Sequence, residues 1–131
     1  LVLSGGDDHP QRLLVEIEML KQFRMREKPV LGICHGAFLL TQLWGGELVP
    51  IEGHRRTEHL ATYKGNDITL NSYHGSAITK APNDAEVLVT DKSGNIESWM
   101  LGNSLAVVWH PERDKDNHWM PEEYKSLIGD I

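Results

Sequence analysis

The sequence predicts an α/β protein in which parallel strands are joined by helical crossovers. Apolar runs at residues 1–4 and 30–33 are typical of buried strands, and a segment with helical periodicity follows each of them. Strand, helix, strand, helix in this order places the two strands side by side and parallel, with the helices packed on the sheet. The length of 131 residues fits one domain, residues 1–131.

The first strand ends in a glycine turn, and a helix follows. Residues 1–4 are apolar on both faces, which is typical of a central strand, so we expect an N-terminal portion of the domain before Leu1. Gly5-Gly6-Asp7-Asp8 predicts a tight loop. The spacing of apolar residues predicts a helix over 11–26 that ends before Pro29, with Leu13, Leu14, Ile17, Leu20 and Phe23 on its apolar face.

The second strand leads directly into a second helix, and the middle of the chain is strand-rich. Residues 30–33 predict a strand that ends at Cys34, and residues 36–44 predict a helix that ends at two glycines. Further strands are expected at 47–51, 61–63, 68–71 and 105–109, a hairpin at 86–91 and 95–100, and a last helix at 121–128.

Composition and charge exclude several classes of protein. Hydrophobic residues are 40% and charged residues 24%, which are ordinary values for a folded domain. The net charge of −6 offers no basic surplus for nucleic acid or an anionic membrane. No run approaches the roughly 20 apolar residues of a membrane span. The single cysteine forms no internal disulfide, so we expect a cytoplasmic protein.

The sharpest motif is Gly32-Ile33-Cys34-His35-Gly36. It matches the nucleophile elbow, in which a strand delivers the nucleophile into a strained turn and a helix begins at once; here cysteine replaces serine. Glycines are needed because side chains there would collide with neighbouring backbone. The helix N-terminus is expected to favour the reactive thiolate. The alternative is a buried structural cysteine, which the two glycines and the strand-to-helix context disfavour.

A cysteine nucleophile needs a base, and His110 is the strongest candidate. It follows the expected strand 105–109 and so lies, like Cys34, at the carboxyl end of a strand, where ligands bind in α/β sheets. Glu112 lies two residues further on and can hold the imidazole in one tautomer. Alone, His-Pro-Glu is more often a surface turn; with the elbow it predicts a triad.

Backbone N–H groups of Gly6 and His35 are candidates for an oxyanion hole, because both residues follow strands at that same edge. An ordinary β–α turn at Gly5-Gly6 is the alternative. The polar segment Asn71-Ser72-Tyr73-His74-Gly75 either borders the pocket or forms a plain turn. His54, Glu58 and His59 lack the spacing and companions of a zinc site, so neither a metal nor another cofactor is expected.

Together these motifs resemble class I glutamine amidotransferase domains with a Cys-His-Glu triad, and the middle of the chain most resembles their γ-glutamyl hydrolase branch. The match runs in order through the whole chain: Ser4–Gly6, Gly32–Gly36, the glycine–histidine loop 53–59, Asn71–His74 and Trp109–Glu112. The resemblance implies a flavodoxin-like α/β/α sandwich with a mostly parallel central sheet and an added antiparallel segment. It implies that Cys34, His110 and Glu112 hydrolyse a γ-glutamyl amide through a thioester. It also implies that the domain begins before Leu1.

The substrate motifs depart from the family pattern. Phe38 stands where relatives often carry a glutamine that holds the substrate, and Gly75-Ser76 replaces a frequent His-Gln pair. Gly5, Phe38, Ser72, Tyr73 and His74 are the expected substrate contacts. Free glutamine is therefore expected to be a poorer substrate than a γ-glutamyl amide with a larger amine, unless Phe38 simply faces the core.

Three readings of the whole chain stay open at this point. The first is a small-molecule amidohydrolase, working alone or passing ammonia to a synthetase partner or fused synthetase domain. The second is a stress-related protein of similar fold that uses His35 beside the cysteine. The third is a non-catalytic binding or regulatory relative. The His110–Glu112 pair favours the first.

Overall fold

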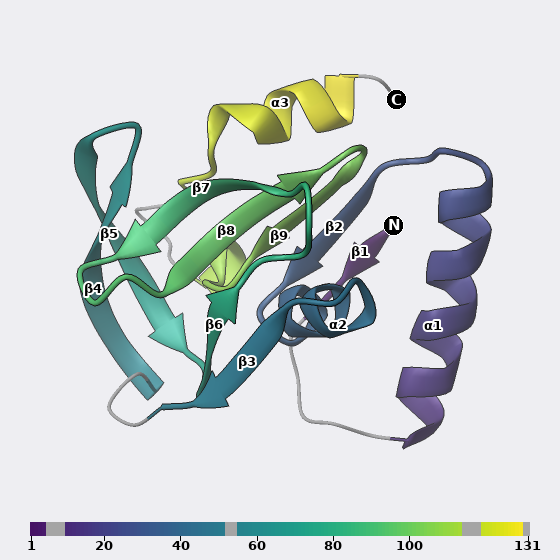
Figure 1. Ribbon diagram of the computed structural model, residues 1–131, viewed down its shortest axis with the longest axis horizontal. Coiled ribbons are helices and arrows are strands. Elements are labelled where there is room, and N and C mark those ends of the chain that lie inside the picture. The colour runs from purple at the N-terminus through teal and green to yellow at the C-terminus, as the bar shows by residue number, and fades with distance from the viewer. Residues whose placement is uncertain (5–9, 52–54, 114–118, 130–131) are drawn as a thin grey trace.

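The computed structural model describes residues 1–4, 10–51, 55–113 and 119–129. Within this part of the chain the strands form one mixed sheet in the order β1-β2-β9-β8-β7-β4-β5. Outside this order, β6 pairs with β8, and β3 pairs with β6. Figure 1 shows helix α1 (Pro10–Met25) beside β1, α2 (His35–Leu43) across the β1–β2 end, and α3 (Glu122–Gly129) along β7 to β9. The α/β class is confirmed.

The parallel part of the sheet consists of β1 (Val2–Leu3), β2 (Val30–Ile33) and β9 (Ser104–Val107). Every residue of β2 and β9 is buried, in keeping with the continuous apolar runs of parallel strands. Among the described residues, β1 pairs with β2 alone, and Val2 is 59% exposed. The expectation that β1 is central in the complete domain stays a prediction, because the strand expected on its other side would precede Leu1.

The antiparallel part is larger than the sequence indicated. It contains β3 (Glu47–Pro50), β4 (Arg55–Tyr63), β5 (Asn66–Tyr73), β6 (Ser76–Lys80), β7 (Glu86–Asp91) and β8 (Ile96–Leu101). The expected β7–β8 hairpin is confirmed, and the Asp91 carboxylate accepts hydrogen bonds from the N–H groups of Ser93 and Asn95 in its turn. Strand β6 was not expected as a separate element.

All three expected helices are confirmed to within two residues at either end. In α1, Leu20 is 3% exposed, but Leu14 and Val15 point away from the core. Helix α2 is fastened to the sheet by Thr41, whose hydroxyl donates to the Ala37 carbonyl and accepts a hydrogen bond from the fully buried Trp99 indole.

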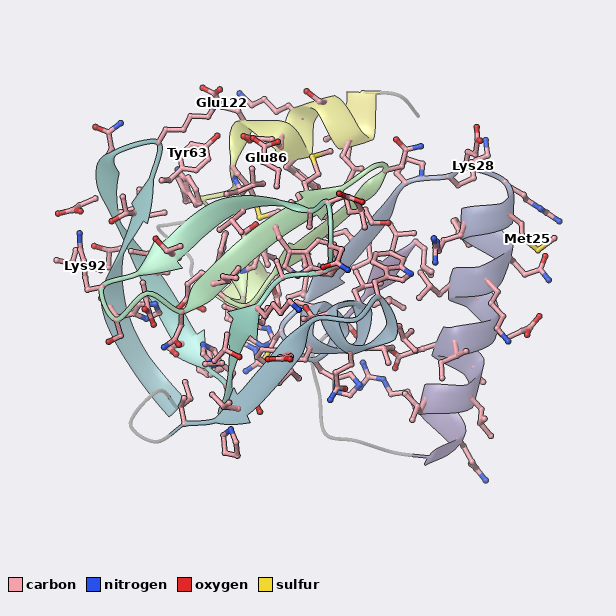
Figure 2. The ribbon with its side chains drawn as sticks, viewed as in Figure 1. Met25, Lys28, Tyr63, Glu86, Lys92 and Glu122 are labelled. Atoms are coloured by element: carbon pink, nitrogen blue, oxygen red, sulfur yellow. The ribbon has the colours of Figure 1, made fainter. Side chains whose placement is uncertain are left out.

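Helix α3 is attached to the tip of the β4–β5 hairpin. The Tyr63 hydroxyl donates to the Glu123 carboxylate at 2.8 Å and accepts from the Glu122 backbone N–H at 3.1 Å. Figure 2 shows Tyr63 and Glu122 close together where the hairpin meets α3. The far end of the antiparallel arm is thereby tied to the C-terminal helix, on which β9 also packs.

Candidate active site

Cys34 occupies a sharp turn between β2 and α2. Its backbone has φ 51° and ψ −104°, a left-handed conformation that costs a non-glycine residue free energy. Its N–H donates to the Val107 carbonyl of β9 at 2.8 Å, and α2 begins at the next residue, His35. Helix and neighbouring strand together hold the cysteine in this conformation, as expected of a nucleophile elbow.

The two glycines of the motif allow the elbow to pack. A Cβ added at Gly36 would lie 2.0 Å from the Leu3 carbonyl oxygen, and one added at Gly32 would lie 2.7 Å from the Gly36 carbonyl oxygen. Both contacts are with backbone, which cannot move aside cheaply. Close packing of β1, β2 and α2 is thus the physical reason for glycine at both positions, as the sequence indicated.

The thiol of Cys34 is buried, and burial raises its pKa. A hydrogen bond from the His35 backbone N–H and the positive charge of Arg113 act in the opposite direction, while the Glu112 carboxylate adds to the rise. The N–H at the helix N-terminus thus favours the thiolate, as expected, but burial outweighs it and the net pKa of the Cys34 thiol is raised. The sulfur needs a base to take its proton.

His110 and Glu112 form a close pair. The imidazole Nδ1 lies 2.5 Å from Glu112 Oε1, and the histidine side chain is 3% exposed while that of Glu112 is 52% exposed. Glu112 belongs to the 3₁₀ turn η1 (Pro111–Arg113), which follows β9. Because Nδ1 is engaged by the carboxylate, Nε2 is the ring nitrogen left to exchange protons.

The parallel ladder brings the nucleophile and the base to one edge of the sheet. Ile33 of β2 is level with Val107 of β9, so Cys34 and His110 both follow the carboxyl ends of adjacent strands. His35 contributes its N–H beside the sulfur, where an oxyanion donor is expected. Gly5 and Gly6, the other residues expected at the oxyanion side, lie outside the described residues.

Asn71 was expected only as part of the polar segment 71–75, with no role of its own, yet it holds the backbone of His110 at two points. Its Nδ2 donates to the His110 carbonyl at 2.7 Å, and its Oδ1 accepts from the His110 N–H at 2.8 Å. Asn71 is 9% exposed and belongs to β5. The polar segment after an expected strand and the resemblance to the family's Asn-Ser-x-His pattern were the signals that pointed to it.

The other residues of this polar segment take different positions. Ser72 is fully buried, and its hydroxyl is 3.1 Å from His74 Nε2; His74 Nδ1 is 2.6 Å from the Ser76 carbonyl. The half-buried Phe38 packs edge-on against His74, with ring centroids 5.7 Å apart. Tyr73 packs edge-on against His110 at 5.6 Å. Tyr73 is thus an expected substrate contact that lies directly against His110.

The described residues contain no group of three or more His, Cys, Asp or Glu side chains arranged to hold a metal ion. None of the helices in the described ranges is long and apolar enough to cross a membrane. Of the segment 53–59, which was expected to be a mixed-charge loop, residues 53 and 54 lie outside the described part and the remainder belongs to strand β4, so the expectation of a loop is wrong there. His59 bonds Glu97 at 2.9 Å.

The family follows from comparison with known proteins. The sequence profile of the class-I glutamine amidotransferases matches residues 1–121, nearly the whole chain. The chain belongs to this family. The match contains the elbow and the His110–Glu112 pair, so the geometry described above is that of a family member.

Individual relatives are similar over most of this chain. A γ-glutamyl-CDP-amidate hydrolase from Campylobacter jejuni is 28% identical over 98% of this chain and 70% of its own length. The carbamoyl phosphate synthase small chain of Thermoplasma acidophilum is 32% identical over 96% of this chain, which spans 37% of that protein. The crystal structure of a Thermotoga maritima glutamine amidotransferase matches the fold with a TM-score of 0.75 at 17% identity, over 98% of this chain and 64% of that one.

Proposed function

We propose that this protein is a cysteine amidohydrolase that cleaves a γ-glutamyl amide through a γ-glutamyl thioester. The observation that carries the proposal is the strained, buried Cys34 on the strand beside the one that leads to the His110–Glu112 pair. Family membership supports amide hydrolysis in general. The roles of individual residues and the substrate are our proposal.

In the first half of the reaction, His110 Nε2 takes the thiol proton and the sulfur attacks the γ-carbonyl carbon. The oxyanion that forms accepts a hydrogen bond from the His35 N–H, with Gly6 as the second proposed donor. Glu112 stabilises the imidazolium. The C–N bond then breaks, and the departing amine takes the proton from His110. Cys34 is left as the thioester.

In the second half, water replaces the amine. His110 accepts a proton from the water as its oxygen attacks the thioester carbon, and the C–S bond breaks. The sulfur regains the proton, and glutamate leaves. The raised pKa of the resting thiol fits this scheme, because the proton is transferred when substrate is bound rather than lost beforehand.

The relatives suggest candidates for the amine. The C. jejuni relative is named for γ-glutamyl-CDP-amidate, and the other relatives cited above are a synthase subunit and an amidotransferase. We propose a γ-glutamyl amide with a large amine as substrate, and a synthetase partner in the cytoplasm if free ammonia is the product. Phe38, which offers no hydrogen bond where relatives often carry glutamine, supports a substrate other than free glutamine.

The test is hydrolysis of glutamine beside a panel of γ-glutamyl amides by the wild type, Cys34→Ser and Phe38→Gln. Cys34→Ser is expected to lose turnover and to yield no acid-quenched glutamyl adduct by mass spectrometry. A Cys34→Ser variant that retains near-normal hydrolysis would remove Cys34 from the mechanism. Wild-type preference for glutamine over every larger amide would overturn the substrate proposal, and Phe38→Gln is expected to move preference toward glutamine.

A further inference from the structure

Three side chains stack at the rim of the candidate site. The Arg113 guanidinium lies over the Tyr73 ring, 4.8 Å from its centroid. The Tyr73 ring meets His110 edge-on, with centroids 5.6 Å apart and planes at 88°. The backbone N–H of Arg113 also donates to the His110 carbonyl at 3.2 Å. The guanidinium is therefore held by both its ring platform and its backbone, next to the proposed base.

The charge of Arg113 is uncompensated within the described residues. None of their ion pairs includes it, although Glu112 is its neighbour in the chain; that carboxylate is turned to His110 instead. Stacking on tyrosine uses the face of the guanidinium and leaves its N–H edge available. That edge matches a carboxylate or a phosphate, which accept two parallel hydrogen bonds.

The location of Arg113 relates it to the reaction. Its charge acts on the Cys34 thiol, lowering the pKa against the effect of burial, so the guanidinium lies within electrostatic range of the sulfur. The whole chain carries a net charge of −6, which repels anions. A cation on the rim is the feature that would attract an anionic substrate to this protein.

We propose that Arg113, held on Tyr73, is a specificity-determining residue that binds an oxyanion of the γ-glutamyl substrate, either a carboxylate or a phosphate. This inference rests on the proposed function. The oxyanion has two sources: an acidic group on the leaving amine, or the α-carboxylate of the glutamyl group. We expect the leaving amine to supply it. In that case γ-glutamyl amides with acidic amines should have a higher kcat/KM than those with neutral amines.

The experiment compares pairs of substrates that differ in one charged group on the leaving amine. γ-Glutamylglycine carries a carboxylate on its leaving amine, and γ-glutamylglycinamide carries a neutral amide there. γ-Glutamyl-phosphoethanolamine and γ-glutamylethanolamine form a second pair with a phosphate. The readout is the ratio of kcat/KM between the charged and the neutral member of each pair, measured for wild type and Arg113→Gln at low and high salt.

The wild type is expected to prefer the charged member of each pair by about 10-fold or more at low salt, and Arg113→Gln to lower that ratio toward one. Arg113→Lys is expected to retain part of the preference, since it keeps the charge and loses the planar edge. Tyr73→Phe keeps the ring platform and should retain the preference for the charged member, whereas Tyr73→Leu should lose part of that preference. Lys80→Gln, which removes an exposed cation from β6, is the matched control and should change nothing.

The alternative source gives a different pattern. If Arg113 binds the α-carboxylate, Arg113→Gln lowers kcat/KM equally for all four substrates and for glutamine. That result supports oxyanion binding by Arg113 and identifies the oxyanion as the α-carboxylate of the glutamyl group. Equal kcat/KM for wild type and Arg113→Gln on every substrate overturns the inference.

A binding measurement separates this inference from the proposed function. Calorimetric titration of γ-glutamylglycine into Cys34→Ala and into Cys34→Ala/Arg113→Gln needs no turnover. If the wild type hydrolyses no substrate of the panel but the double variant binds at least 10-fold more weakly, the proposed reaction fails and the oxyanion site stands. If both variants bind alike, the oxyanion site fails whatever the reaction.

Discussion

At the scale of single residues, the candidate site depends on contacts between segments far apart in the sequence. Cys34 and His110 were identified from local motifs, because an elbow and a His-Pro-Glu run are visible in a few adjacent residues. The role of Asn71 was missed because its partner lies 39 positions away in the chain. Arg113 of the turn η1 was missed for the same reason, since the ring of Tyr73 that it stacks on belongs to the distant strand β5.

Replacing Asn71 is expected to damage catalysis more than substrate binding. Asn71→Ala leaves the buried N–H of His110 without its Asn71 partner and the His110 carbonyl with the Arg113 N–H alone, and a displaced catalytic group loses rate steeply. We expect kcat to fall about 10- to 100-fold with KM within about twofold. Steady-state kinetics on the preferred amide, over a range of pH, provide the measurement.

The control for this prediction is Asn95→Ala, which removes a side-chain hydrogen bond to Asp91 in the β7–β8 turn, away from the triad. It should lower the melting temperature and leave kcat unchanged. If Asn71→Ala lowers only the melting temperature, Asn71 is a structural residue with no part in positioning His110.

At the scale of the elements, the order of strands and helices was predictable while their pairing was not. Periodicity and the Lys92-Ser93-Gly94-Asn95 turn located α1, α2 and the β7–β8 hairpin. The polar alternation of β4 to β6 blurred their limits, and no local pattern tells that β4 pairs with both β5 and β7. Such pairings depend on which distant strand buries the same face.

The contact between β1 and α2 makes a sharp prediction about Gly36. Gly36→Ala would place a Cβ 2.0 Å from the Leu3 carbonyl oxygen and force backbone apart, so we expect a loss of about 3 kcal/mol or more in the free energy of unfolding. Gly129→Ala in α3 is the matched control. Among the described residues, no atom lies within 4 Å of its added Cβ, and the substitution should raise stability by up to about 1 kcal/mol. Urea denaturation measures the free energy of unfolding of both variants. Equal free energies for Gly36→Ala and Gly129→Ala would contradict the close approach of Gly36 to Leu3.

A second prediction concerns the antiparallel arm, where β4 and β8 share a buried ion pair. Glu97 is 2% exposed, lies where the β7–β8 register shifts, and accepts from His59 at 2.9 Å. This hydrogen bond raises the pKa of His59, against the opposing effect of burial. The contribution of the His59–Glu97 pair to the free energy of unfolding is therefore fully present below the ordinary histidine pKa of about 6.5. It is lost as pH rises through the higher pKa of His59 in the folded state.

Glu97→Gln should reveal this dependence. The free energy of unfolding of the wild type is expected to exceed that of Glu97→Gln by about 1–3 kcal/mol at pH 5.5, and by less at pH 9. Urea titrations across this range measure the difference. Asp67→Asn, which breaks the exposed Lys92–Asp67 pair, should show a small effect with little pH dependence. A difference for Glu97→Gln that grows with pH would contradict the sign argued here.

At the scale of the whole molecule, one continuous sheet carries every part of the candidate site. The proposed nucleophile Cys34 follows β2, the proposed base His110 follows β9, and Asn71 and Tyr73 belong to β5 at the other end of the strand order. The chain spans 70% of the length of the C. jejuni relative and 37% of the length of the T. acidophilum relative. Motifs in the sequence were sufficient for the family and for an added antiparallel segment, whereas the pairing that brings β5 to His110 was not foreseen.

This continuity predicts that the whole domain unfolds in one transition. Trp99 and Trp109 are at most 1% exposed, so their fluorescence reports the loss of tertiary packing. In a urea titration, the midpoint of the far-UV circular dichroism change should coincide with that of tryptophan fluorescence. A circular dichroism change at clearly different urea than the fluorescence change would mean that part of the sheet opens as a separate unit.

At Cys34, with its left-handed backbone, the stability of the fold and the proposed chemistry favour different residues. Glycine at position 34 would adopt the same φ of 51° without strain, and would be expected to give a more durable protein by about 1 kcal/mol. Such a protein would have no nucleophile. Stability alone therefore gives no reason to keep cysteine here, and a descendant that no longer needed the reaction would gain by losing it. The cysteine is best explained as a residue that chemistry retains against the preference of the fold.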